Sequence, residues 1–196
     1  PANIDAANLI VQNRDSAETF SLRSVRTELI PEGAGGWEIH GQGGDLSIAG
    51  QPELEVERFR GRLQGNEVFI NEAEVDIFED ARLSGNGTVA FSEGTPIDLD
   101  LQISNLDVKK VLGPEWQEKV TGTLRGEITV TGSASGPGGL RQKGTLHLDD
   151  GLLIDLPILG KVADYTRSDR FRRLTLSQAR ADFERQGERI VITKIE

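Results

Sequence analysis

The fold of this chain is decided by the stretch Ile97-Asp98-Leu99-Asp100-Leu101-Gln102-Ile103-Ser104. Apolar and polar side chains alternate along it without interruption. Successive side chains of a β-strand point to opposite faces, so this segment has one apolar face and one polar face. A helix built from the same residues would scatter its apolar side chains around the whole surface. The stretch therefore predicts a half-buried strand.

The same alternation recurs along the chain, with glycine-rich and charged turns between the segments. This pattern is typical of an antiparallel meander. We expect about ten strands or more, in an all-β fold that is a mostly antiparallel, elongated and curved sheet or groove. The further segments are Ala73/Val75/Ile77, Leu83/Val89/Phe91, Ile128/Val130, Leu146/Leu148, Ala179/Ala181/Phe183, Ile190/Ile192, and the regions 19–30, 37–48 and 54–63.

Two sequence features indicate where the strands turn or bend. Asp149-Asp150-Gly151 predicts a turn between two strands, because Asp and Gly adopt the backbone conformations that tight turns need. Gly85-Asn86-Gly87 predicts a bend.

Two segments, near 107–120 and 157–166, have helical instead of strand spacing. In the first, Asp107 is the expected N-cap, and Pro114 should end one short helix or open a second. The second segment is a short apolar helix that starts at a proline. The apolar residues with this spacing are Val108, Val111, Leu112, Trp116 and Val120, followed by Ile158, Leu159, Val162, Ala163 and Tyr165.

The domain organisation follows from the uniform pattern. We expect residues 1–196 to be a single β-rich segment, with 1–95 and 96–196 as possible sub-units. The sequence starts at Pro1 and contains no methionine, and the alternation continues to its last residues. We therefore expect a segment of a larger protein that is truncated at both ends.

Composition and charge limit the function. The net charge is −10, from 32 acidic and 22 basic residues, which argues against nucleic acid as a partner. It also disfavours adsorption of the whole segment to anionic lipid headgroups, although an apolar acyl chain would not meet this surface field. The chain has no cysteine, so disulfides and thiolate metal sites are excluded. No apolar run approaches the roughly 20 residues of a membrane-spanning helix.

No motif for catalysis, a metal or a cofactor is present. His40 and His147 both alternate to the polar side of their strands and lack neighbours at metal-ligand spacing. Asp98 and Asp100 share a strand face and could bind a cation or flank a glycosidic bond, but a solvated polar face is the favoured interpretation. We predict that the chain is not an enzyme and has no cofactor.

A basic cluster, Arg167-Ser168-Asp169-Arg170-Phe171-Arg172-Arg173, contrasts with the acidic chain. It could contact phospholipid headgroups or an acidic partner. The favoured interpretation is a charged turn and edge strand that discourages pairing with other sheets.

The C-terminal half carries a set of short motifs in a fixed order. Gly144-Thr145-Leu146-His147-Leu148-Asp149-Asp150-Gly151 suggests a strand pair, and Leu156-Pro157-Ile158-Leu159 a short helix. Phe171-Arg172-Arg173-Leu174 and Ala179-Arg180-Ala181-Asp182-Phe183 suggest two further strands. This order resembles the C-terminal region of the AsmA-like proteins, which are related to the TamB- and YhdP-type periplasmic bridge proteins. The resemblance covers roughly residues 98–196.

The resemblance implies a large periplasmic protein of Gram-negative bacteria, anchored in the inner membrane by a part outside this segment. Such proteins have a long curved β-sheet with an apolar concave face, and are linked to lipid transport and outer-membrane biogenesis. Phospholipids or other acyl chains are the implied partners.

Two hypotheses for the function follow. In the first, the chain is a non-enzymatic module whose alternating aliphatic side chains line a groove for acyl chains. In the second, it is a structural or adhesive β-protein with an ordinary filled core. Alternation does not distinguish them, because both need one apolar face. The candidate groove residues are Leu99, Leu101, Ile103, Leu124, Ile128, Val130, Leu146 and Leu148.

Overall fold

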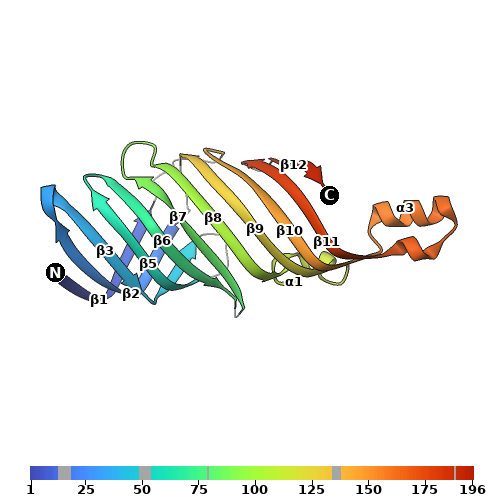
Figure 1. The fold of residues 1–196 in the computed structure, drawn as a ribbon, viewed down its shortest axis with the longest axis horizontal. Coiled ribbons are helices and arrows are strands. Elements are labelled where there is room, and N and C mark those ends of the chain that lie inside the picture. Colours follow the sequence, from blue (N-terminus) through green and yellow to red (C-terminus); the bar gives the residue numbers. More distant parts are fainter. Residues whose placement is uncertain (13–18, 49–53, 79, 134–137, 188) are drawn as a thin grey trace.

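The computed structural model describes residues 1–12, 19–48, 54–78, 80–133, 138–187 and 189–196. It confirms the all-β fold, because the described residues form a twelve-stranded antiparallel sheet (Figure 1). The strands are β1 (Ala2–Gln12), β2 (Thr19–Glu32), β3 (Gly36–Gln42), β4 (Asp45–Ile48), β5 (Leu54–Gln64), β6 (Glu67–Ile77), β7 (Ala81–Ala90), β8 (Pro96–Asp107), β9 (Val120–Ser133), β10 (Leu140–Ile154), β11 (Arg173–Gln186) and β12 (Arg189–Ile195).

Almost every strand pairs with its neighbours in sequence. The order is β1-β2-β3-β5-β6-β7-β8-β9-β10-β11-β12, and β4 pairs with β2 and β5. Strands β3 and β4 therefore share one position between β2 and β5, and are separated by Gly43 and Gly44, which both have positive φ. Strands β7 and β8 pair through Val89 and Ile97, so one sheet continues across the boundary between 1–95 and 96–196.

The strand register gives the sheet one apolar and one polar face. Side chains of directly paired residues lie on the same face, so a row of paired residues can be followed across the sheet. One such row crosses eleven strands and contains a single polar residue, Thr27. It consists of Ile4, Thr27, Gly41, Phe59, Ala73, Gly85, Leu101, Ile128, Gly144, Phe183 and Ile192. We call the face that carries this row the apolar face.

The polar face is crossed by ion pairs between neighbouring strands. Arg58 on β5 lies 2.8 Å from Glu72 and 2.6 Å from Glu74 on β6. Arg125 on β9 donates a hydrogen bond of 2.7 Å to Asp149 on β10, and this bond lowers the pKa of Asp149. Such solvent-exposed pairs contribute little to stability, so they help to fix the register more than they stabilise the fold.

Both predicted helical regions are present. The first contains α1 (Val108–Val111) and α2 (Pro114–Gln117). As expected, Asp107 caps α1, since its carboxylate accepts a 2.9 Å hydrogen bond from the backbone N–H of Lys109. Pro114 opens the second helix at its first position, where its missing N–H costs nothing. Helix α1 packs against β9, and its first residue, Val108, is buried.

The second helical region lies between β10 and β11. Helix α3 (Pro157–Thr166) has the predicted bounds and is followed by the short 3-10 helix η2 (Asp169–Arg172). Another short 3-10 helix, η1 (Gly33–Gly35), joins β2 to β3. Figure 1 shows α3 projecting beyond the sheet, past the ends of β10 and β11.

The prediction of a turn at Asp149-Asp150-Gly151 is wrong. These residues lie inside β10, so the expected strand pair of 144–153 is one strand. Asp150 does adopt the positive φ that a turn would use, at 51°. Here that conformation accompanies a register shift against β9, which is a bulge and not a reversal of the chain. Gly85-Asn86-Gly87 likewise stays within β7, and the register shift there lies in the facing strand β6.

The sheet is a single layer over most of its area. A compact protein of 21.4 kDa exposes about 9,100 Å², whereas this chain exposes 13054 Å². Among the described residues no large side chain is fully buried. The buried apolar residues are few, and are Val25, Leu54, Val56, Val75, Ala81, Leu106, Val108, Val130 and Ala163.

Candidate functional site

The fold brings all eight candidate groove residues to one face of three adjacent strands. On β8 and β9, Leu99 pairs with Val130 and Leu101 pairs with Ile128. On β9 and β10, Leu124 pairs with Leu148. Ile103 and Leu146 are both paired with Gly126, which lies between them on β9. The eight residues therefore form one continuous patch of the apolar face.

These side chains lie over the glycines of the neighbouring strands. A Cβ atom added at Gly85 would lie 2.6 Å from Leu101 Cδ2, and one added at Gly126 would lie 2.7 Å from Leu146 Cδ2. The ring of Phe183 covers Gly144 in the same way, at 3.0 Å. Because each large side chain occupies the space above a glycine, the apolar face is covered by its own side chains. This explains why seven of the eight candidates are half-buried although no second layer covers them, while Val130 is buried.

The patch extends further than the sequence analysis predicted. Phe59, Phe183 and Ile192 belong to the row of paired residues that crosses eleven strands through Leu101, which we call the Leu101 row, but they were not among the eight candidates. Their alternation is visible in the sequence, but only the register shows that they continue the same row. Exposure rises toward β12, where Ile190 is 61% exposed and Ile195 is 72% exposed.

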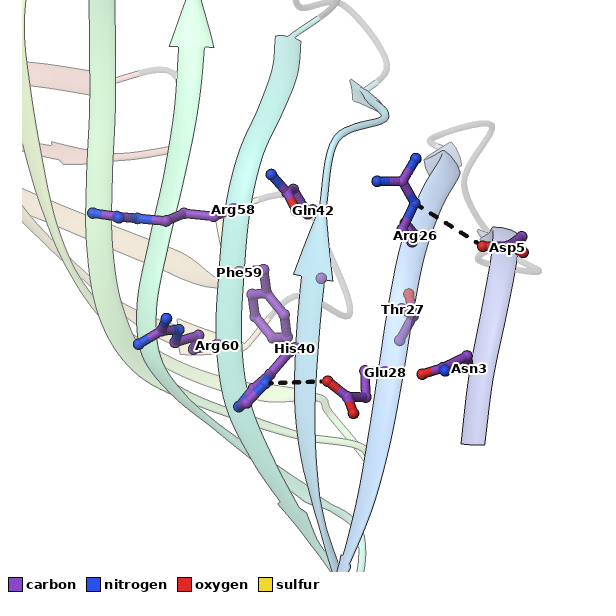
Figure 2. Close-up of a pocket in the computed structure, with 11 residues that line it drawn as sticks. Asn3, Asp5, Arg26, Thr27, Glu28, His40, Gln42, Arg58, Phe59 and Arg60 are labelled. Atoms are coloured by element: carbon purple, nitrogen blue, oxygen red, sulfur yellow. Dashed lines mark ion pairs between the residues drawn. The ribbon is translucent and has the colours of Figure 1, made fainter. Parts of the chain in front are cut away.

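Two hollows can be described, and most of the residues that line them belong to the polar face. The first, of about 640 Å³, lies over β1, β2, β3 and β5 (Figure 2). Asn3, Glu28, His40 and Arg60 line it and are paired in register across these strands. Thr27, Gly41 and Phe59, which belong to the row of the apolar face, line it as well.

The polar groups of this first hollow are tied to one another by ion pairs. His40 Nδ1 lies 3.9 Å from a Glu28 oxygen, and its Nε2 lies 2.8 Å from Glu38. Arg26 lies 4.0 Å from Asp5, and both side chains are largely exposed. Figure 2 shows that Arg58 and Arg60 extend away from this pair. The arrangement is a solvated ion-pair network.

The second hollow, of about 500 Å³, lies over β6, β7, β8 and β9 and is acidic. Glu72, Glu74, Asp100 and Glu127 line it. Thr129 donates a 2.9 Å hydrogen bond to Asp100, and Arg58 forms ion pairs with both Glu72 and Glu74. In the described part of the chain, no group of three or more His, Cys, Asp or Glu side chains could hold a metal ion.

Of the eight groove candidates, Leu101 and Ile128 are among the residues that line the second hollow, and the other six line neither hollow. What the structure places on the apolar side is an open face and not a walled channel. Both histidines lie on the polar face as predicted, because His147 pairs with Arg125 and Arg180. Trp37 and Trp116 are 40% and 39% exposed, so each packs at a rim.

Comparison with known proteins leaves the resemblance to AsmA-like proteins as a prediction. No family model, no curated protein and no solved structure matches the chain. Among the described helices, none is long and apolar enough to cross a membrane.

Proposed function

We propose that the chain is a non-enzymatic lipid-handling module whose apolar face binds acyl chains. The observation that carries the proposal is the Leu101 row, which crosses eleven strands with one polar residue. An acyl chain is long, narrow and apolar, so it matches a continuous apolar row better than it matches an enclosed pocket. An exposed apolar face of this extent in a folded protein marks an interaction site.

The packing of large apolar side chains over the glycines of neighbouring strands also supports this proposal. Leucine side chains that lie over glycines make a shallow apolar surface without deep cavities. Such a surface would let a lipid tail slide along the row without a large barrier, since no single contact dominates. Transfer would then be passive, with no bond made or broken.

The AsmA-like motifs extend the proposal to a cellular setting. We place the module in the periplasm of a Gram-negative envelope, as part of a protein that is anchored in the inner membrane and takes part in outer-membrane biogenesis. This placement rests on the motif resemblance alone.

The proposal is tested by putting a charge on the patch. Leu101 and Ile128 are directly paired at the centre of the apolar face, so the double variant Leu101→Asp/Ile128→Asp interrupts the row at one point. We expect it to abolish binding of a fluorescent fatty acid and to remove phospholipid that copurifies with the wild-type chain. Native mass spectrometry with lipid extraction measures the second effect.

A matched control carries the same two charges on the other face. Ser104 pairs with Arg82 and Thr131 pairs with Arg141 on the polar face. The variant Ser104→Asp/Thr131→Asp puts each new carboxylate opposite an arginine, so it should fold and bind lipid normally. Equal loss in both variants, or no lipid binding by the wild-type chain, would refute the proposal and leave the structural or adhesive hypothesis.

A further inference from the structure

The projecting lobe between β10 and β11, residues 155–172, differs in charge from the rest of the molecule. A 2.8 Å hydrogen bond from the backbone N–H of Asp155 to the carbonyl oxygen of Arg172 closes its base. Inside the lobe, α3 packs against η2 and Ala163 is 2% exposed. The lobe holds four basic and three acidic residues, so its net charge is +1 within a chain of net charge −10.

The basic residues of the lobe are not all neutralised locally. Arg172 is paired with Asp164 at 2.8 Å and with Asp169 at 3.1 Å. One arginine therefore forms ion pairs with both of these aspartates. Among the residues that the structure describes, Lys161 and Arg167 carry no ion pair and are exposed.

An exposed aromatic side chain lies beside these cations. Tyr165 is 92% exposed, and Val162, one helical turn earlier, is 38% exposed. Lys161 lies four residues before Tyr165, so all three side chains share one side of α3. A tyrosine has an apolar ring and a polar hydroxyl, which suits the headgroup region of a bilayer.

The end of α3 shows a local conflict between sequence and structure. Arg167 adopts the left-handed conformation, with φ 50°. Its backbone N–H bonds to the carbonyl of Asp164, and that of Ser168 bonds to the carbonyl of Ala163. This is a Schellman motif, in which glycine is the usual residue. A cation therefore occupies the position where glycine would cost less, and such conflicts are concentrated at functional positions.

We propose that this lobe docks on an anionic phospholipid surface, with Tyr165 at headgroup depth and Lys161 and Arg167 contacting lipid phosphates. The acidic net charge of the chain does not prevent this. Helix α3 has ten residues and is about 15 Å long, whereas the Debye length at physiological salt is about 8 Å. The lobe projects beyond the sheet (Figure 1). When its tip contacts a membrane, salt therefore screens the repulsion between the acidic strands and the anionic lipids.

The experiment uses the fact that Tyr165 is the only tyrosine of the chain. Protein labelled with 3-fluorotyrosine gives one fluorine resonance, which reports on this site alone. Vesicles of equal parts phosphatidylglycerol and phosphatidylcholine should broaden and shift this resonance, and added sodium chloride should reverse the change. Vesicles of pure phosphatidylcholine should leave it unchanged.

The variant Arg167→Gly removes one positive charge from the lobe without destabilising its fold. Glycine suits the left-handed position, so thermal stability should be retained or raised, while loss of one cation near the surface should weaken vesicle binding about fivefold. Tyr165→Ser should also weaken binding in a co-sedimentation assay. The control Arg141→Gln removes an exposed cation from the polar face of β10 and should bind as the wild type does.

Three results would overturn the proposal. They are an unchanged fluorine resonance with anionic vesicles, equal response to both vesicle types, and Arg167→Gly binding as tightly as the wild type. An acidic protein partner for the lobe would give the first of these results. The fatty-acid assay contains no bilayer, so loss of vesicle docking and loss of acyl-chain binding are observed separately.

Discussion

Gly126→Ala tests the packing of leucine side chains over glycines. Gly126 is buried on β9, and an added Cβ would lie 2.6 Å from the carbonyl oxygen of Thr145 and 2.7 Å from Leu146 Cδ2. Both distances are well below van der Waals contact. Leu146 would have to rotate, and β9 and β10 would have to move apart.

The cost of this change can be estimated. Overpacking by one methyl group costs about 1–3 kcal/mol, while replacing glycine restricts the unfolded chain and returns about 0.4–1 kcal/mol. We therefore expect a net loss of about 1–2 kcal/mol. For a chain of this length, that loss lowers the melting temperature by about 2–8 °C. Thermal unfolding followed by circular dichroism measures it.

A second glycine provides the control. A Cβ added at Gly33 would have nothing within 4 Å, so Gly33→Ala should change only the entropy of the unfolded chain and be neutral or slightly stabilising. If Gly126→Ala is as stable as the wild type, or if both variants shift the melting temperature equally, the side chain of Leu146 does not fill the space above Gly126.

Two further predictions concern single polar contacts. Asp107→Ala removes the N-cap of α1 and should cost about 1 kcal/mol in urea unfolding, whereas Asp107→Asn should retain most of the stability; equal losses would contradict the capping role. A hydrogen bond from Thr145 lowers the pKa of Asp182 from 3.8, and Arg180 lowers it further. A carboxyl group with a lowered pKa stabilises the fold above its unfolded pKa and loses this effect as the pH falls through the folded pKa. Asp182→Asn should therefore lower the urea midpoint at neutral pH, with the difference disappearing below pH 3.8, and a constant difference at all pH values would exclude this origin.

The faces of the sheet could be predicted from sequence because they depend on a local rule. Alternation at 97–104 assigns each side chain to one side, whatever its neighbours are. The eight candidates consequently lie on one face, as the register shows. The N-cap Asp107 and the start of α2 at Pro114 were predictable for the same reason, since capping and proline geometry act within a few residues.

Other features depend on pairing between distant residues and were not predictable. Asp150 has the backbone conformation of a turn residue, and only its pairing partners show that the chain continues as one strand. The cover of Gly126 by Leu146 links residues twenty positions apart and exists only in one register. The lobe is a similar case. Its helix has the predicted bounds, but no local sequence pattern indicates that it projects from the sheet.

The single-layer arrangement has a consequence for how the protein opens. Each strand has its main contacts with the strands next to it in the sheet, so stability is transmitted from neighbour to neighbour, as in a repeat protein. Loss of an edge strand then removes one interface and leaves the remainder intact. Backbone amides should exchange with solvent fastest in β12, whose side chains are all exposed, and progressively more slowly toward the centre of the sheet. The edge strands should therefore open locally before the centre of the sheet unfolds.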